Sequence, residues 1–294
     1  MKRTKTTKLS RVDAILTGDW HLREDTPVCR TDDFQRNQWL KVGQVNALQA
    51  KYQCPVIHSG DLFNHWKPSP WLLSKAMEHI PDQFYTVYGN HDLPQHSIQL
   101  EDKSGIFAMS MAGKLEILSG THWGNTPERA SFHYDPAISI LVWHTMTYQG
   151  KLPWPGCEDP TGSRLLKQYP EFDLILTGHN HKGFVAELDG RLLVNPGSLM
   201  RQDADQIDYR PRVYLYNAEE NRVEPYYLPV EPDAVSRLHI EKDESRNQRI
   251  SAFVERLNTR EIKGANFEEN LDEFFRNNKI RESVKNITYK AIES

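Results

Sequence analysis

The chain contains short apolar runs, each of which stops at a glycine or a polar residue. Continuous apolar runs of this length are typical of buried strands in an α/β sheet. They therefore predict strands at residues 12–17, 55–59, 84–88, 138–143 and 172–177.

Helical patterns separate several of these runs. Residues 33–52 place apolar side chains at spacings of three to four, from Trp39 to Tyr52. Ser69 is a favourable N-cap, and Pro70 suits the first position of a helix that ends near Pro81. The alternation of strands and helices predicts a largely parallel, doubly wound region.

The pattern changes to hairpins after residue 183. Asp189-Gly190 is the signal of a tight β-turn, and a second polar connection lies at 217–221. We expect these hairpins to belong to a second sheet that packs against the first, flanked by helices. The predicted hairpin strands are 184–188, 192–195, 213–216 and 223–228.

Composition narrows the class of protein. Hydrophobic residues make up 38% of the 294 residues and charged residues 26%, as in a globular protein. The three cysteines form no CxxC pair, which excludes a zinc ribbon and a disulfide framework. Without an apolar leader or a membrane-length segment, we expect a cytoplasmic protein. The net charge of −4 does not indicate a general nucleic-acid binder, although residues 1–11 form a basic N-terminal arm.

Polar residues follow every one of the five predicted strands. In open α/β sheets, ligands bind beyond the carboxyl ends of the strands, so we expect these residues to converge at one edge. They are Asp19, His21, Asp61, Asn90, His144, His179 and His181.

These residue types predict a metal centre. Carboxylate, amide and imidazole ligands without thiolate suit manganese, iron or zinc better than calcium or copper. Seven ligands exceed the needs of one tetrahedral ion but suit two ions that share a carboxylate, for which Asp61 is the natural candidate. We expect two divalent ions, Mn²⁺ first, with Mg²⁺, Fe²⁺ or Zn²⁺ as alternatives.

One histidine beside the expected ligands is available for acid–base chemistry. His91 follows Asn90 and precedes Asp92, which could hold the second ring nitrogen of His91 and keep the imidazolium charged. We therefore predict that His91 and Asp92 are catalytic, with His91 as the general acid. The same four residues, 89–92, could also form only a turn. His58 is predicted to be a core residue and His96 a surface residue.

The ordered motifs resemble those of the calcineurin-like metallophosphoesterase superfamily across residues 12–230. They are Asp-x-His, Gly-Asp, Gly-Asn-His-Asp, a lone His and Gly-His-x-His. The resemblance implies a four-layer α/β/β/α sandwich of two mixed sheets, followed by a short C-terminal α-rich appendage. It implies one metal held by Asp19, His21, Asp61 and His181, and the other held by Asp61, Asn90, His144 and His179.

Within that superfamily, the local sequence is similar to SbcD-type nucleases of DNA double-strand-break repair, from phage or bacteria. The matching segments are Gly18–Leu22, Gly60–Phe63, Lys67–Ser69 and Gly89–Asp92. This similarity implies a manganese-dependent DNA nuclease, with DNA, an SbcC-type coiled-coil ATPase and a second copy of the chain as partners. On the substrate side it indicates Asn64, His65 and Lys67, where Asn64 stands at a position usually held by His or Asp.

Residues 231–294 form a capping or partner-docking segment with apolar stripes at helical spacing, broken at Gly264. Packing on the chain's own domain and docking to a partner ATPase or second subunit remain alternatives. The stripes contain Ile250, Phe253, Val254, Leu257, Phe267, Leu271, Phe274, Ile280, Val284, Ile287 and Ala291.

Two enzymatic functions compete. A DNA exo- or endonuclease is favoured by the SbcD-like segments, and a small-molecule phosphodiesterase or phosphomonoesterase, for example one acting on cyclic nucleotides, by the modest length and negative charge. A Ser/Thr protein phosphatase is disfavoured because its characteristic arginines are replaced by Asn64-His65-Trp66 and Asp92-Leu93-Pro94. A metal-free scaffold would have lost ligands, and none of the expected ligands is missing.

Overall fold

The computed structural model describes residues 9–127, 132–133, 138–259 and 267–292. Most of the basic arm and the break at Gly264 lie outside the described residues, as do the side chains of Phe253, Val254 and Leu257. The chain divides into two compact units, Met1–Arg237 and Leu238–Ser294.

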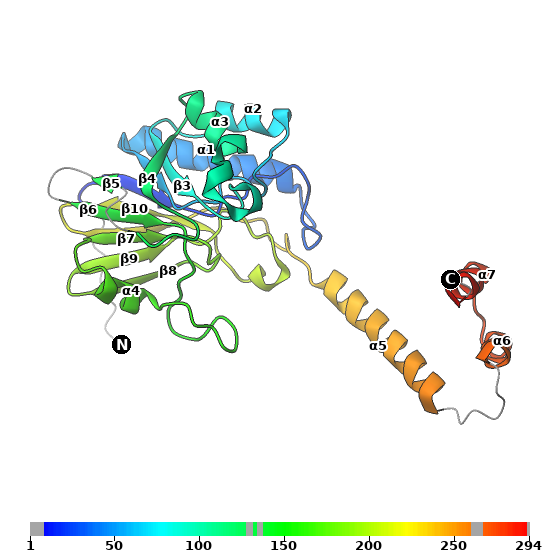
Figure 1. Cartoon of the computed structure of the whole chain (residues 1–294). Coiled ribbons are helices and arrows are strands. Elements are labelled where there is room, and N and C mark those ends of the chain that lie inside the picture. Colours follow the sequence, from blue (N-terminus) through cyan, green and yellow to red (C-terminus); the bar gives the residue numbers. More distant parts are fainter. Residues whose placement is uncertain (1–8, 128–131, 134–137, 260–266, 293–294) are drawn as a thin grey trace. The chain divides into compact units, whose positions relative to one another are not determined.

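The first unit contains two stacked sheets (Figure 1). The first sheet has the strand order β11-β10-β1-β2-β3-β4, and the second has the order β5-β6-β7-β9-β8. The strands of the first sheet are β1 (Ala14–Thr17), β2 (Val56–His58), β3 (Phe84–Tyr88), β4 (Glu116–His122), β10 (Arg212–Asn217) and β11 (Arg222–Tyr227). Those of the second are β5 (Phe132–His133), β6 (Ser139–Trp143), β7 (Leu174–Thr177), β8 (Phe184–Leu188) and β9 (Arg191–Asn195).

Both sheets are mixed. Strands β1 to β4 run parallel to one another, and β10 joins β1 in the antiparallel direction with Ile15 opposite Leu215. In the second sheet β6, β7 and β9 are parallel, while β5 and β8 are antiparallel edge strands.

Helices connect the parallel strands, and their first turns are capped by side chains. The Ser69 hydroxyl accepts a hydrogen bond from the backbone N–H of Leu72 at 3.1 Å, and Pro70 begins the helix, as the sequence predicts. The helices of this unit are α1 (Phe34–Tyr52), α2 (Pro70–His79), α3 (Gly105–Met111) and α4 (Gly162–Gln168), with 3₁₀ turns η1 (Pro94–His96), η2 (Ile98–Lys103) and η3 (Ala204–Gln206).

Three apolar layers hold the unit together. Side chains of α1, α2 and α3 pack on one face of the first sheet, around Val45, Leu72 and Ile106. The opposite face of that sheet packs on the second sheet through residues such as Leu16 and Val142. Helix α4 covers the outer face of the second sheet. The α/β/β/α sandwich is therefore confirmed, whereas the doubly wound arrangement is wrong, because each sheet has helices on only one face.

The sequence suggested that the hairpin of β10 and β11 belongs to the second sheet. In the structure it extends the first sheet instead. Strand β10 is buried on both faces: Tyr214 and Tyr216 face the second sheet while Val213 and Leu215 face the helical side. A strand with this pattern of side chains could pair with the edge of either sheet. Contacts between distant parts of the chain, and not the local sequence, therefore decide which sheet it joins.

The second unit contains α5 (Leu238–Thr259), α6 (Phe267–Asn277) and α7 (Glu282–Ile292). Helices α6 and α7 meet where the rings of Phe275 and Tyr289 lie 5.7 Å apart, and Leu271 is buried beside them. Val284 and Ile287 remain exposed on α7. Among the described residues of both units, no helix combines the length and apolarity needed to cross a bilayer.

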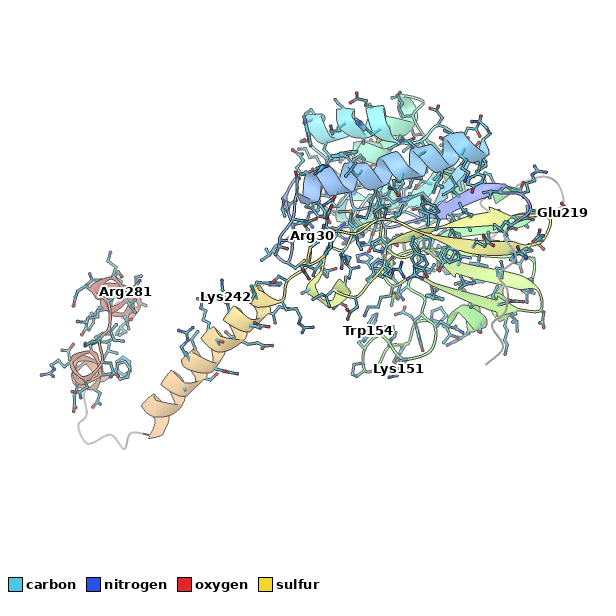
Figure 2. The ribbon with its side chains drawn as sticks, turned by 180° about the vertical axis from the view of Figure 1, so that it is seen from behind. Arg30, Lys151, Trp154, Glu219, Lys242 and Arg281 are labelled. Atoms are coloured by element: carbon cyan, nitrogen blue, oxygen red, sulfur yellow. The ribbon has the colours of Figure 1, made fainter. Side chains whose placement is uncertain are left out.

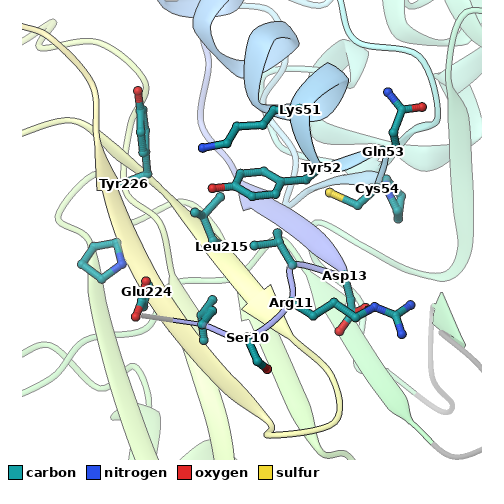
Figure 3. A pocket seen from close by; sticks show the side chains of 14 residues that line it. Ser10, Arg11, Asp13, Lys51, Tyr52, Gln53, Cys54, Leu215, Glu224 and Tyr226 are labelled. Carbon is teal, nitrogen blue, oxygen red and sulfur yellow. The ribbon is translucent and has the colours of Figure 1, made fainter. Parts of the chain in front are cut away.

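A cavity of about 740 Å³ lies at the amino end of β1 (Figure 3). Its lining includes Asp13, Tyr52, Cys54, Glu224 and Tyr226. Because the predicted ligands follow the carboxyl ends of the strands, this cavity lies at the other end of the sheet and is separate from the candidate metal centre.

Candidate metal centre

The carboxyl ends of strands from both sheets meet at one edge of the sandwich. The loops after β1 and β2 continue the pairing of their strands, since Asp19 N–H donates to the Gly60 carbonyl at 3.1 Å and His21 N–H to the Asp61 carbonyl at 3.0 Å. The second sheet is tied to them by His179 N–H, which donates to Asp19 Oδ1 at 3.0 Å. The sequence suggested that these residues converge at the edge of one sheet. In the structure, the site is shared by the edges of two sheets.

The backbone is strained where these side chains are presented. Asp19, His21, Asp61 and His179 have φ values of 49°, 45°, 58° and 73°, in the left-handed region that costs a non-glycine residue about 1–2 kcal/mol. Strain of this kind persists where surrounding structure enforces it and is typical of functional sites.

Glycines make room for this packing. A Cβ on Gly89 would lie 2.1 Å from Asp61 Oδ1, and a Cβ on Gly60 would lie 2.7 Å from His144 Nδ1. Gly60 also has a φ of 96°, which only glycine adopts readily. Both glycines are required for the loops to approach each other.

A first group of possible ligands contains Asp19, His21 and His181. The two Nε2 atoms of His21 and His181 are 3.0 Å apart, and each lies 3.9 Å from Asp19 Oδ1. Asp19 Oδ2 and His21 Nδ1 are buried and have no hydrogen-bond partner among the described residues. Such converging, partly unsatisfied donor atoms suit a cation.

A second group contains Asp61, His144 and His179, with Asn90 between the two imidazoles. His144 Nε2 lies 3.2 Å from Asp61 Oδ2 and 3.1 Å from Asn90 Oδ1, which is 3.0 Å from His179 Nδ1. His144 Nδ1 donates to the Ser59 carbonyl at 2.7 Å, so in the neutral ring the Nε2 lone pair faces two oxygen acceptors. The repulsion between this lone pair and the two oxygens is relieved only when a proton or a cation lies between Nε2 and the oxygens.

Asp61 lies between the two groups. Its Oδ2 is 3.6 Å from His21 Nε2, and it also forms a third possible ligand group with His21 and His91. Burial opposes its ionisation, but His144 and His21 hold the pKa of Asp61 well below its usual range. A charged carboxylate in this position can bridge two cations.

Burial sets the protonation of the histidines. It lowers the pKa of His21 well below its usual value and that of His179 to about 4, so both are neutral and available as ligands at pH 7. For His144, burial is outweighed by the Asp61 carboxylate, which raises the pKa to about 9.

All seven predicted ligands thus lie together, and the groups of His and Asp side chains are consistent with a dinuclear metal site. The donor set fits divalent ions because it combines buried carboxylates, an amide oxygen and neutral imidazoles without thiolate. The role of each residue as a ligand stays a prediction.

His91 lies at the same centre, but its ring is held by a backbone carbonyl and not by Asp92. Its Nδ1 is 2.8 Å from the carbonyl oxygen of Asn64, which can only accept, so Nδ1 carries the proton and donates. Its backbone N–H donates to Asp61 Oδ1 at 2.8 Å, and its ring lies edge-on to that of His21 at 4.7 Å. Nε2 is therefore the ring nitrogen left for a substrate.

The prediction that Asp92 holds the His91 ring is wrong. The buried Asp92 carboxylate instead accepts four backbone N–H bonds at 2.8–3.4 Å. The donors are Asp61, Leu62, Phe63 and Gly89. Asp92 therefore fixes the loop that carries Asp61, and the Asn64 carbonyl fixes the His91 ring.

The predicted substrate-side residues occupy the loop after β2. Asn64 contributes its backbone carbonyl to His91, whereas His65 and Lys67 are exposed and joined by a bond from Lys67 N–H to His65 Nδ1 at 3.2 Å. A contact of these three residues with substrate stays a prediction.

Two further residues at the centre were not assigned to it from the sequence. The rings of Trp123 and His179 are in contact, with centroids 4.5 Å apart and a tilt of 32°, and Trp123 meets His144 edge-on at 5.9 Å. His96 is exposed, as expected of a surface residue, but its Nδ1 lies 2.8 Å from the Asn90 carbonyl oxygen. Trp123 directly follows β4, a strand that the apolar pattern did not reveal, so the only available signal was an aromatic residue before the turn at Gly124.

The fold and this centre together define a metal-dependent phosphoesterase. Residues 14–215 match the calcineurin-like phosphoesterase superfamily domain, which covers more than half of the chain. The chain therefore belongs to the calcineurin-like phosphoesterase superfamily.

Relatives of known identity are distant. The DNA double-strand break repair protein Mre11 of Haloferax volcanii is 26% identical over an alignment of 221 positions, which covers 68% of this chain and 48% of that protein. The chain thus spans about half the length of this relative.

Two of the solved structures to which the chain is similar are less identical to it in sequence. An archaeal phosphodiesterase is 15% identical, with a TM-score of 0.42 over 73% of this chain and 99% of that one. The protein TT1561 of Thermus thermophilus is 11% identical, with a TM-score of 0.45 over 74% and 99% of the two chains.

Proposed function

We propose that this phosphoesterase hydrolyses DNA phosphodiester bonds as an SbcD-type nuclease of DNA repair or recombination. The observation that carries the proposal is the similarity to a DNA double-strand break repair protein over 221 residues. The SbcD-like segments around Asp19 and Lys67 support the same substrate.

The residues at the centre suit phosphodiester hydrolysis. The chemistry that two divalent ions supply in such a site is polarisation of the phosphoryl group and activation of water. Asp19, His21, Asp61 and His181 would hold one ion, and Asp61, Asn90, His144 and His179 the other. Mn²⁺ is the expected ion.

His91 would act on the leaving group. Because its Nδ1 donates to the Asn64 carbonyl, Nε2 is the nitrogen from which a proton would pass to the leaving oxygen. The hydrogen bond also fixes the ring plane before substrate arrives, so no reorientation is needed during the reaction.

The partners follow from the same resemblance. We propose an SbcC-type coiled-coil ATPase and a second copy of the chain as partners of this nuclease. The exposed apolar residues of α7, Val284 and Ile287, support a docking role for the second unit.

A second candidate function is hydrolysis of small phosphodiesters or phosphomonoesters at the same centre. It is favoured by the net charge of −4 and by the carboxylates of Asp203 and Asp205 beside the centre, which do not attract a long polyanion.

One experiment separates these functions. The Mn²⁺-loaded protein is incubated with end-labelled linear DNA, single- and double-stranded, and in parallel with bis-p-nitrophenyl phosphate. DNA cleavage that is lost in His91→Ala supports the nuclease. Hydrolysis of the small diester while both DNA forms stay intact favours the second candidate.

A further inference from the structure

An exposed tryptophan lies on a loop beside the metal centre. Residues 149–160 lie between β6 and α4, and the ends of this loop meet where Tyr148 bridges Thr161 and Gly162 N–H donates to the Tyr148 carbonyl at 2.9 Å. Trp154, in the middle of this loop, is 48% exposed. Figure 2 shows Trp154 and Lys151 on the loop, away from the body of the sandwich. A large aromatic side chain is thus held at the surface by a loop with closed ends.

The loop forms one wall of a pocket of about 290 Å³ that opens on the candidate metal centre. Pro153 and Trp154 line it together with His179 and His181, and both histidines belong to the groups described above. The volume is at the lower limit for a ligand pocket and suits one ring system with an attached sugar, not a duplex. The remaining lining residues are Met146, Asn180, Lys182, Asp203, Asp205 and Gln206.

The charges of the pocket do not favour a phosphate. Asp203 and Asp205 contribute two carboxylates, and Lys182 is paired with Asp205 at 3.2 Å. Asp203 is paired with His181, whose Nδ1 lies 3.8 Å from Asp203 Oδ2. Both carboxylates are therefore already paired with the basic side chains beside them, which leaves no free cation among the lining residues for a phosphate, whereas a neutral ring needs none. The phosphate is better placed at the metal centre next to the pocket.

The polar wall of the pocket is already ordered. Asn180 Nδ2 donates to the Thr147 carbonyl at 2.6 Å, and Asn180 Oδ1 accepts from Lys182 N–H at 3.1 Å. Gln206 Oε1 accepts from Gln202 N–H at 2.6 Å. These bonds hold the wall in place without a ligand, so a flat group could enter with little reorganisation.

We propose that Trp154 stacks on the nucleobase next to the scissile phosphate, so that the substrate class is a nucleotide whose base is unpaired at the cleavage position; this rests on the function proposed above. A base that remains paired and stacked in a duplex cannot present its face to Trp154. Stacking of a base on an aromatic side chain contributes a factor of about 5 to 150 in binding and tolerates any base.

Two chromogenic diesters test the pocket without DNA. Thymidine 5′-(p-nitrophenyl phosphate) carries a base, and methyl p-nitrophenyl phosphate carries the same leaving group without one. For the Mn²⁺-loaded wild type we expect a higher kcat/KM on the thymidine ester. In Trp154→Ala, the kcat/KM for the thymidine ester divided by that for the methyl ester should fall about tenfold. In Trp154→Phe, this ratio should stay close to that of the wild type.

Leu152→Ala is the matched control, because Leu152 is 54% exposed on the same loop and does not line the pocket. Its ratio should equal that of the wild type. An unchanged ratio in Trp154→Ala, or a wild type with no preference for the thymidine ester, would overturn the base-stacking role.

Oligonucleotides separate this role from the nuclease function. A single abasic residue next to the cut should slow the wild type about tenfold and Trp154→Ala far less. If both proteins are slowed equally, Trp154 does not contact the base. If DNA is not cut while the thymidine ester keeps its Trp154-dependent advantage, the nuclease function fails and the base pocket stands.

Discussion

The ring of His91 is held by the carbonyl oxygen of Asn64, 2.8 Å from Nδ1, and not by its sequence neighbour Asp92. A neutral carbonyl orients the imidazole without adding a negative charge. The second ring nitrogen, Nε2, is left to exchange a proton with substrate. The orientation of His91, the proposed general acid, thus depends on the backbone of the loop after β2.

Replacement of His91 by alanine should therefore remove turnover while the metal groups stay intact. General acid catalysis contributes a factor of about 10² to 10⁴, so kcat should fall by that amount. Metal content by mass spectrometry should equal that of the wild type. A His91→Ala protein that purifies without metal would show instead that His91 is a ligand, as its place beside His21 and Asp61 also allows.

Asp92→Asn should affect stability as well as activity. An amide presents one oxygen and one NH₂ group, so in either orientation two of the four backbone N–H donors face a donor. At about 1–3 kcal/mol for each unsatisfied group, the free energy of unfolding should fall by about 2–6 kcal/mol.

Urea denaturation measures this loss, with Asp102→Asn, an exposed position, as the control. An Asp92→Asn protein as stable as the control would mean that the carboxylate is not needed to hold the loop.

Gly89→Ala tests the close approach of the two loops. The new methyl group would lie 2.1 Å from Asp61 Oδ1, so the carboxylate must move away from its position between the two groups. We expect Mn²⁺ affinity to fall about 100-fold or more, measured by titration calorimetry.

Gly43→Ala is the matched control for that substitution. It lies within α1, where a Cβ meets no other atom within 4 Å, and should raise stability by about 0.5–1 kcal/mol. Unchanged Mn²⁺ affinity in Gly89→Ala would argue against Asp61 as the shared ligand.

Metal affinity should rise with pH up to about 9. In the metal-free protein His144 is protonated below that value, because the Asp61 carboxylate raises its pKa to about 9 against the effect of burial. A cation must displace this proton, so the affinity should increase about tenfold per pH unit between pH 6.5 and 9 and level off above it. Calorimetry in buffers of different ionisation enthalpy would detect the released proton. An affinity that does not vary across this range would contradict the protonated state of His144.

The same proton links pH to the stability of the metal-free fold. Because the pKa of His144 is raised above its usual value of 6.5, its contribution is complete below pH 6.5 and is lost as pH rises through about 9. Thermal unfolding of the metal-free protein should therefore shift to lower temperature across that interval. A constant midpoint would exclude a net contribution from this group.

The positions of the predicted ligands could be read from the sequence because they follow short apolar runs that are typical of buried strands. The strand β3, for example, has the predicted bounds Phe84–Tyr88 and delivers Asn90 two residues later. Parallel strands place their carboxyl ends at the same edge of a sheet. The pattern of strands in the sequence is therefore enough to predict which residues lie near one another at the site.

The side-chain contacts within that neighbourhood were not predictable. His91 and Asp92 are adjacent in sequence, but the turn directs Asp92 toward the backbone of residues 61–63 and His91 toward Asn64. Trp123 was missed because β4, which precedes it, mixes polar and apolar residues as an edge strand does. Contacts of this kind depend on the meeting of segments distant in sequence.

The bond between Asp19 and His179 joins residues 160 positions apart in the chain and crosses from one sheet to the other. Other hydrogen bonds also cross between the sheets, such as that from Thr121 Oγ1 to the Val142 carbonyl at 2.5 Å. Most of the interface is an apolar layer, which resists separation but resists sliding mainly through the fit of its side chains. Ions held by ligands from both sheets would add directional bonds at this edge and would cross-link the two sheets there. Metal loading would then govern how rigidly the two halves of the sandwich keep their alignment, in addition to the chemistry between them.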